Sequence, residues 1–145
     1  MRVWLLIIAL FPACAARPPA PVPIRIGEDA CASCRMTILS GSTAAQIITP
    51  GDEPVMFDEI GCLQQYLAAH AVAGTATVFV ADHRTGAWVE AGDAVFTKTA
   101  MQTPMSSGVL AHADAASRDA DRAAAGGRPI DAGQAIGTTR RNDTR

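Results

Sequence analysis

Short runs of alternating apolar and polar residues recur along the chain, a pattern typical of β-strands that have one face in a core. Most of these runs end at glycine, proline or aspartate, which favour turns. The turn-forming sequences at residues 50–54 and 82–86 predict two hairpins. Together the runs predict strands at residues 24–26, 43–49, 55–57, 75–81, 87–90, 95–97, 108–113 and 128–130.

Two other segments are predicted to be helical. The first covers residues 59–70, with Asp58 expected as its N-cap. Its apolar residues recur at three- and four-residue spacing and define one face: Ile60, Leu63, Tyr66, Leu67 and Ala71. Cys62 lies beside this face, so we expect an inert buried thiol there. The second helix covers about residues 114–125, with Asp114 as its cap.

The two halves of the chain repeat one order of elements. Residues 24–81 and 87–130 each contain a strand, a loop that carries sulfur, a strand or hairpin, a helix and a final strand. This order predicts an α+β fold of two small, similar ββαβ-like halves in one domain at residues 24–130. Residues 131–145 are polar and lack periodicity, so we expect a disordered C-terminal tail.

The first residues have the pattern of an export signal. One positive charge precedes an apolar run at residues 3–11, and a small residue stands directly before Cys14. This arrangement resembles the cleavage box of bacterial lipoproteins, in which the cysteine is lipidated and becomes the mature N-terminus. We therefore expect a signal peptide at residues 1–13, lipidation of Cys14 and a proline-rich spacer over residues 14–23. The alternative is an ordinary secretory signal that leaves Cys14 as a spare thiol.

Composition narrows the class of partner. A formal charge of −2 and a pI near 5.8 give no support to nucleic acid. The chain contains no run of 18 apolar residues that would make a permanent transmembrane helix. With Cys14 lipidated, Cys31, Cys34 and Cys62 remain in an oxidising compartment, and an odd number leaves at least one thiol for other chemistry.

The segment Cys31-Ala-Ser-Cys34-Arg-Met36 brings three sulfur atoms into six residues. Thiolate and thioether are soft ligands that favour Cu(I), whereas zinc sites hardly ever use a thioether, so Met36 distinguishes between the two metals. A Cys-x-x-Cys pair by itself also suits zinc, redox chemistry or a small-loop disulfide, with the methionine as core filler. We expect Cys34 and Met36, and next Cys31, to be the metal ligands.

A second sulfur-bearing loop supplies a further candidate ligand, Met105, which follows Pro104. The predicted duplication would place this loop near the first one, although a half-buried core methionine fits the pattern equally well. Met101 is a weaker candidate. So are His83 and His112, because a lone histidine is more often a surface or hydrogen-bonded residue than a ligand.

Several motifs coincide in order and spacing: the lipobox-like Cys14, CASCRM at residues 31–36, FDEIGCLQQYL at residues 57–67, VADHRTGAWVEA at residues 80–91 and TPM at residues 103–105. Together they resemble the NosL family of copper-binding lipoproteins of nitrous-oxide respiration, over roughly residues 22–130. The resemblance implies a periplasmic chaperone, anchored to the outer membrane and not an enzyme. It would bind Cu(I) and deliver it for assembly of the copper centres of nitrous-oxide reductase. The implied partner is an ABC-type membrane complex, and the implied fold is related to that of organomercurial lyase.

The family's Cys-x-x-Cys-x-Met corresponds here to Cys31, Cys34 and Met36, and its Thr-Pro-Met ends at Met105. One position departs from the family, which usually has glycine where this chain has Arg35. If the loop needs positive φ there, the arginine is strained; otherwise the loop follows another course, or the guanidinium lowers the pKa of a thiol nearby. The residues also leave open an enzyme, a periplasmic thiol–disulfide oxidoreductase that uses the Cys-x-x-Cys pair.

Overall fold

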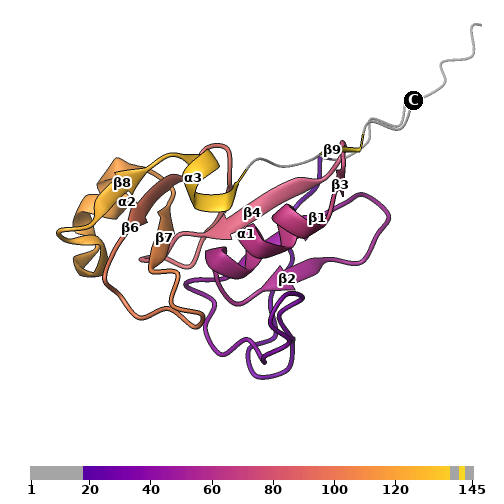
Figure 1. Cartoon of the computed structure of the whole chain (residues 1–145), viewed down its shortest axis with the longest axis horizontal. Helices are drawn as coiled ribbons and strands as arrows, with labels where there is room; N and C mark the ends of the chain where they lie inside the picture. Colours follow the sequence, from indigo (N-terminus) through magenta and orange to yellow (C-terminus); the bar gives the residue numbers. More distant parts are fainter. Residues whose placement is uncertain (1–17, 138–140, 143–145) are drawn as a thin grey trace, which may run out of the picture.

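The computed structural model describes residues 18–137 and 141–142, and its two halves lie side by side (Figure 1). The first half comprises β1 (Ala45–Ile48), β2 (Val55–Phe57), α1 (Ile60–Ala69), β3 (Val72–Ala73), β4 (Thr77–Ala81) and β5 (Trp88–Glu90). The second half comprises β6 (Val95–Lys98), β7 (Val109–His112), α2 (Ala115–Ala120), the 3₁₀ helix η1 (Arg122–Ala124) and β8 (Arg128–Ile130). The chain continues into α3 (Ala132–Ile136) and β9 (Arg141–Asn142).

Both halves have the same strand topology. The first sheet has the order β2-β1-β4-β5 and the second has the order β7-β6-β8, and every pairing within them is antiparallel. In each of these sheets the first strand lies between the second strand and a strand from beyond the helix, which is β4 in the first half and β8 in the second. The first sheet also contains β5, and β3 pairs with β9 in a separate two-stranded parallel sheet. The predicted α+β class is confirmed, and the repeated ββαβ order is present in the topology.

One hydrophobic core serves both halves. Phe57, Leu63 and Val80 from the first half belong to the same buried cluster as Phe96 and Val109 from the second. Burial of these side chains from both halves favours their packing as one unit, since removal of apolar surface from water is the main favourable contribution to folding.

The segment after β4 connects the two sheets. Asp82 forms a parallel bridge with Ala111, and the N–H of His83 donates to the C=O of Ala111 at 2.8 Å. The buried Asp82 carboxylate accepts from the N–H of Ala113 at 2.8 Å. Burial raises the pKa of Asp82, but hydrogen bonds, that from the Ala113 N–H foremost, hold the pKa well below its ordinary value. The ionised side chain therefore joins the end of β4 to the end of β7.

Residues 24–26 do not form the predicted strand. The N–H of Arg25 donates to the Asp29 carboxylate at 2.8 Å, and the C=O of Arg25 accepts from the N–H of Asp29 at 2.9 Å. This local turn, with Gly27 at a φ of 83°, uses the backbone groups that a strand would offer to a neighbour. The first sulfur-bearing loop therefore precedes the hairpin of its half, whereas the second lies between β6 and β7. The predicted equivalence of the two loops was wrong.

The second helix is shorter than predicted. Asp114 is confirmed as the N-cap of α2, because its carboxylate accepts from the N–H of Ser117 at 2.7 Å. The helix ends at Ala120, since Asp121 caps η1 instead by accepting from the N–H of Ala123 at 2.9 Å.

The prediction of a disordered tail was wrong for residues 131–137. Asp131 and Gln134 form a capping box that starts α3, in which the Asp131 carboxylate accepts from the Gln134 N–H at 2.8 Å. The side chains of Ala135 and Ile136 are buried in the core. This short helix packs on α1, where the Gln64 amide donates to the C=O of Gln134 at 3.2 Å. The tail is polar in composition, but two apolar residues are enough to anchor it.

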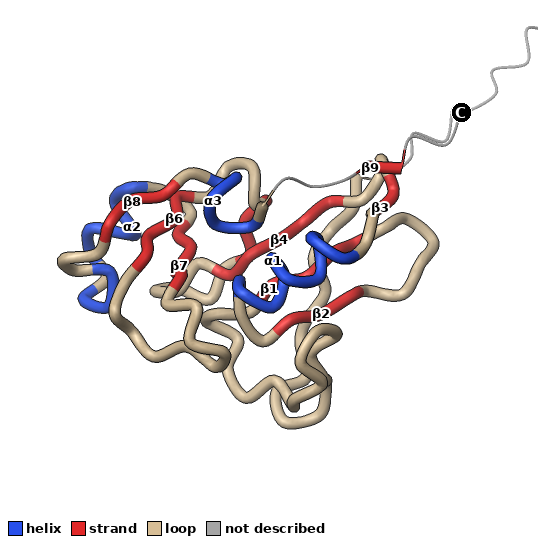
Figure 2. The backbone as a smooth tube through the Cα atoms, in the orientation of Figure 1, coloured by secondary structure: helices blue, strands red, loops and turns tan. Residues whose placement is uncertain are grey.

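Figure 2 shows that the described chain before β1 consists of loop and turn. Within the described residues, no helix combines the length and apolar character needed to cross a bilayer. The predicted signal peptide at residues 1–13 and the lipidated Cys14 lie outside the described residues.

Candidate metal site

Residues 29–38 form a closed loop that fixes the positions of the first sulfur atoms. The N–H of Cys31 donates to the C=O of Met36 at 2.8 Å, and the N–H of Arg35 donates to the C=O of Cys31 at 3.0 Å. The loop attaches to β2 through the N–H of Ala32, which donates to the C=O of Met56 at 2.8 Å. Arg35 adopts a φ of 66°, so the loop does require the left-handed conformation there and places an arginine in it.

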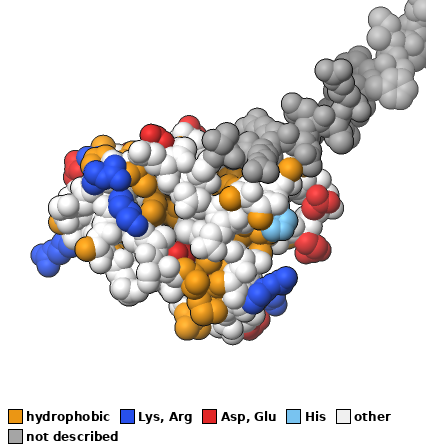
Figure 3. Space-filling model, viewed as in Figure 1, with side chains coloured by type: hydrophobic (Ala, Val, Ile, Leu, Met, Phe, Trp, Pro, Cys, Tyr) orange, Lys and Arg blue, Asp and Glu red, His pale blue; other side chains and the backbone are white. Residues whose placement is uncertain are grey.

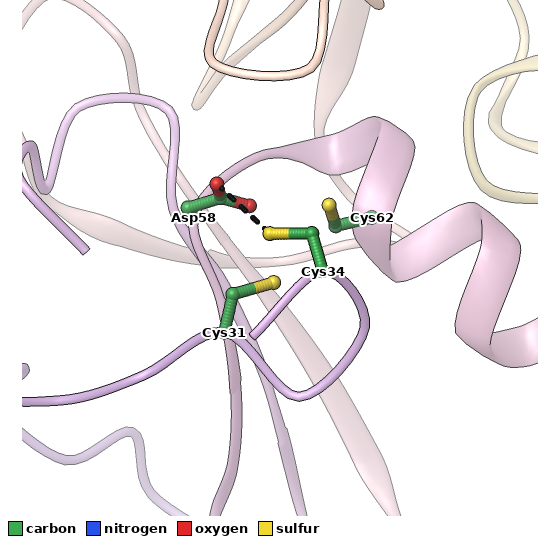
Figure 4. Close-up of side chains that lie close together, drawn as sticks. All are labelled: Cys31, Cys34, Asp58 and Cys62. Atoms are coloured by element: carbon green, nitrogen blue, oxygen red, sulfur yellow. Dashed lines mark hydrogen bonds between the residues drawn. The ribbon is translucent and has the colours of Figure 1, made fainter. Parts of the chain in front are cut away.

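Four potential ligand atoms converge at this loop. The sulfur atoms of Cys31, Cys34 and Cys62 and a carboxylate oxygen of Asp58 all lie within 4.8 Å of one another. Figure 4 shows the three sulfur atoms pointing toward a common space, two from the loop and one from the start of α1. Cys31 and Cys62 are fully buried, whereas Cys34 is half-buried. All three are free thiols. The Cys31–Cys34 disulfide that the sequence left open is therefore not formed here.

Asp58 belongs to this cluster rather than to the helix terminus. The N-cap of α1 is Glu59, whose side chain makes no capping bond, so the predicted Asp58 cap was wrong. The thiol of Cys34 donates to one carboxylate oxygen of Asp58 at 3.5 Å, the dashed line in Figure 4. The other carboxylate oxygen is buried without a hydrogen-bond partner. A buried, half-satisfied carboxylate beside three thiols is the kind of group that a bound cation would stabilise.

Burial controls the protonation of the cluster. Desolvation raises the pKa of Cys34 above its ordinary value, and it raises the pKa of Cys62 further. These two thiols are therefore neutral at neutral pH until something displaces their protons. A metal ion does this, because the thiolate is the form that binds metals. The pKa of Cys34 is raised rather than lowered, so the alternative in which the Arg35 guanidinium activates this thiol is not supported.

Met36 lies on the solvent side of the cluster. Its side chain is 44% exposed and lines, together with Asp58 and Pro104, a largely apolar cavity of about 400 Å³. Leu39 lines the same cavity and is 77% exposed. Figure 3 shows an apolar area over this part of the surface. Met36 thus shares the lining of an apolar cavity with Asp58, a member of the thiol cluster.

The second sulfur-bearing loop also reaches this region. Pro104 lines the Met36 cavity, and the hydroxyl of Ser107 donates to the buried carboxylate of Glu59 at 3.1 Å. Met105 and Met101 are 43% and 37% exposed, and neither belongs to the hydrophobic core or packs against it, so the alternative of a half-buried core methionine at Met105 is not supported. Assignment of Met105 as a ligand stays a prediction.

The two candidate imidazoles do not join the thiol cluster. His83 and His112 instead contact Asp121 in the second half. Sequence reasoning also gave too little weight to Cys62, which supplies one of the converging sulfur atoms. The useful signal was the spacing Asp58-x-x-x-Cys62, because residues four apart across a helix start lie on one side of it.

The donor set of three thiols and one carboxylate suits soft and borderline metals. The same set is compatible with Zn²⁺, which takes sulfur and carboxylate oxygen in four-coordinate sites. A thioether ligand would favour Cu(I) over Zn²⁺, and Met36 is the methionine of the same loop.

A family model described as NosL matches residues 21–135 of the chain. No curated protein and no solved structure matches the chain. The relation to organomercurial lyase therefore stays a prediction.

Proposed function

The chain belongs to the NosL family of copper-binding accessory proteins of nitrous-oxide reductase maturation, and from this premise we propose that it is a Cu(I) chaperone. It would hold one Cu(I) ion as cargo and deliver it for assembly of the reductase's copper centres. The observation that carries the proposal is the convergence of three thiols beside an exposed methionine, in a chain of this family. Cu(I) prefers this combination of thiolate and thioether.

The gradient of exposure across the site supports transfer rather than storage. Cys31 and Cys62 are fully buried, Cys34 is half-buried, and Met36 is 44% exposed. An incoming ligand from a partner therefore approaches from the Met36 side. It displaces the thioether first, because a neutral thioether holds the ion less strongly than an anionic thiolate. The buried thiolates retain the ion until the partner supplies replacements.

The family is associated with the periplasm, and we propose the same location for this chain, with Cys14 lipidated and inserted in the outer membrane. The partner would be the ABC-type maturation complex and, through it, nitrous-oxide reductase. The partner's chemistry must include soft ligands, since hard oxygen ligands would not remove Cu(I) from thiolates.

The alternative enzyme, a thiol–disulfide oxidoreductase, has less support. Such enzymes depend on a thiolate with a lowered pKa, whereas burial raises the pKa of Cys34. The other member of the pair, Cys31, is fully buried and inaccessible to a protein disulfide.

The test is an anaerobic titration of the reduced protein with Cu(I) against a competing chelator. We expect one ion per chain, with weaker binding in Cys34→Ser and in Met36→Leu. Met101→Leu is the matched control, because this methionine has similar exposure but lies outside the Met36 cavity lining. Undiminished binding in Met36→Leu, or reduction of a test disulfide that is indifferent to Met36, would contradict the proposal.

A further inference from the structure

A second group of potential ligands lies in the other half of the molecule. His83 follows β4, His112 is the last residue of β7, and Asp121 caps η1. Nδ1 of His83 lies 2.6 Å from Oδ2 of Asp121, and Nε2 of His112 lies 3.0 Å from the same oxygen. The three potential ligand atoms lie within 4.8 Å of one another. This cluster shares no residue with the thiol site.

The backbone around the three side chains is held rigidly. The N–H of His83 donates to the C=O of Ala111, so both histidines attach to the same strand. The other carboxylate oxygen of Asp121 accepts from the N–H of Ala123 at 2.9 Å, which orients the carboxylate toward the imidazoles. An orienting hydrogen bond of this kind is the usual support of a metal-binding carboxylate.

The three side chains of this cluster are far more buried than the partners of an ordinary surface ion pair. The side chains of His83, His112 and Asp121 are 12%, 0% and 10% exposed. Nδ1 of His112 is buried without a hydrogen-bond partner. Burial raises the pKa of Asp121, but hydrogen bonds from His112 and His83 outweigh it and lower the pKa to about 2. An anion is thus maintained between two imidazoles in a largely water-free position.

We infer that His83, His112 and Asp121 form a site for a divalent transition-metal ion of the Zn²⁺ class. Two imidazole nitrogens and one carboxylate oxygen are a ligand set for such ions and contain no soft sulfur, so the site does not favour Cu(I). Three protein ligands leave a coordination position open. Asp121 also lines a cavity of about 480 Å³ with Thr97 and Arg118.

The potential ligands of this cluster are nitrogen and oxygen atoms, whereas those of the thiol site are mainly sulfur atoms. A protein that holds Cu(I) on sulfur in one half would hold a borderline divalent ion on nitrogen and oxygen in the other. The two sites are independent in residues and in ligand type, so failure of one does not imply failure of the other.

The probe is Zn²⁺, added to the reduced, ¹⁵N-labelled full chain while the imidazole ¹⁵N resonances are recorded. The chain has three histidines, so the assignment is simple, and the exposed His70 is an internal control. We expect Zn²⁺ to shift the ring-nitrogen resonances of both His83 and His112 and to leave those of His70 unchanged. The result does not depend on whether the cysteines also bind Zn²⁺, because each histidine reports on itself.

Variants provide a second measurement. Asp121→Asn and His83→Gln should each weaken Zn²⁺ binding at this site by at least about tenfold, whereas His70→Gln should leave the binding unchanged. If a variant fails to fold by circular dichroism, the wild-type resonances alone decide. Zn²⁺ that leaves the His83 and His112 resonances unchanged would overturn the inference and identify the cluster as a hydrogen-bonded triad.

Discussion

Replacing Cys62 by serine should reduce the pH dependence of Cu(I) binding as well as its strength. Cys62 is fully buried, its sulfur belongs to the thiol cluster, and burial raises the pKa of its thiol. The free protein therefore holds this thiol in the neutral form over roughly pH 6 to 8. If Cys62 binds copper, the proton must leave when the ion arrives.

The magnitude follows from proton linkage. Each thiol that loses one proton on binding makes the affinity rise about tenfold per pH unit, which corresponds to about 1.4 kcal/mol. Cys34 and Cys62, whose pKa values are both raised, together contribute about a hundredfold per pH unit. Serine stays protonated and does not bind Cu(I), so Cys62→Ser should lower the slope by about one decade per pH unit.

The assay is the anaerobic chelator competition repeated at several pH values, with the chelator's own protonation taken into account. Met36→Leu is the matched control, because a thioether carries no proton: the variant should bind more weakly at every pH with the same slope as wild type. A slope that Cys62→Ser leaves unchanged would show that Cys62 is a spectator, whatever the change in affinity.

Three further changes test how the site is supported. Arg35→Gly should raise the free energy of unfolding by about 1 kcal/mol in urea denaturation, because glycine tolerates the φ of 66° that strains arginine; an unchanged midpoint would argue against strain there. Gly61→Ala should destabilise the protein by about 1–3 kcal/mol, since a Cβ would lie 2.5 Å from a Glu59 oxygen and 2.6 Å from the Ser107 Cβ; wild-type stability would show that the second sulfur-bearing loop moves freely. Ile136→Ala should cost about 2–5 kcal/mol if α3 is part of the core, whereas a loss below about 0.5 kcal/mol in thermal unfolding would show that the segment is detachable.

The sequence determined the secondary structure closely where local patterns are strong. Alternation and β-branching located the strands of the two main sheets but missed the two-residue β3, and the three- and four-residue spacing located α1 within one residue at each end. Those patterns are readable because each element buries one face, and that requirement sets the period of its residues. The short 24–26 pattern failed because an aspartate four residues from Arg25 competed for the backbone.

Motifs within a few residues of one another were also readable. The Cys-x-x-Cys-x-Met segment identified the loop, and the arginine at the family's usual glycine position raised a positive φ as one of three alternatives. The structure selects that alternative, with Arg35 at a φ of 66°. These motifs did not show which distant residues complete the site, because that depends on how helix α1 packs against the loop.

Tertiary structure decided the rest. Asp58 and Cys62 become neighbours of Cys31 and Cys34 through packing across more than twenty residues of chain, and local propensity had assigned both to ordinary roles. In the same way, folding brings Asp121 between two histidines that are 29 residues apart in the sequence. Each histidine, taken alone, was a weak candidate for a metal ligand. A local sequence pattern shows which conformation and environment a residue prefers. A metal site depends instead on the distances between segments that are far apart in the sequence, and those distances are set only when the common core forms.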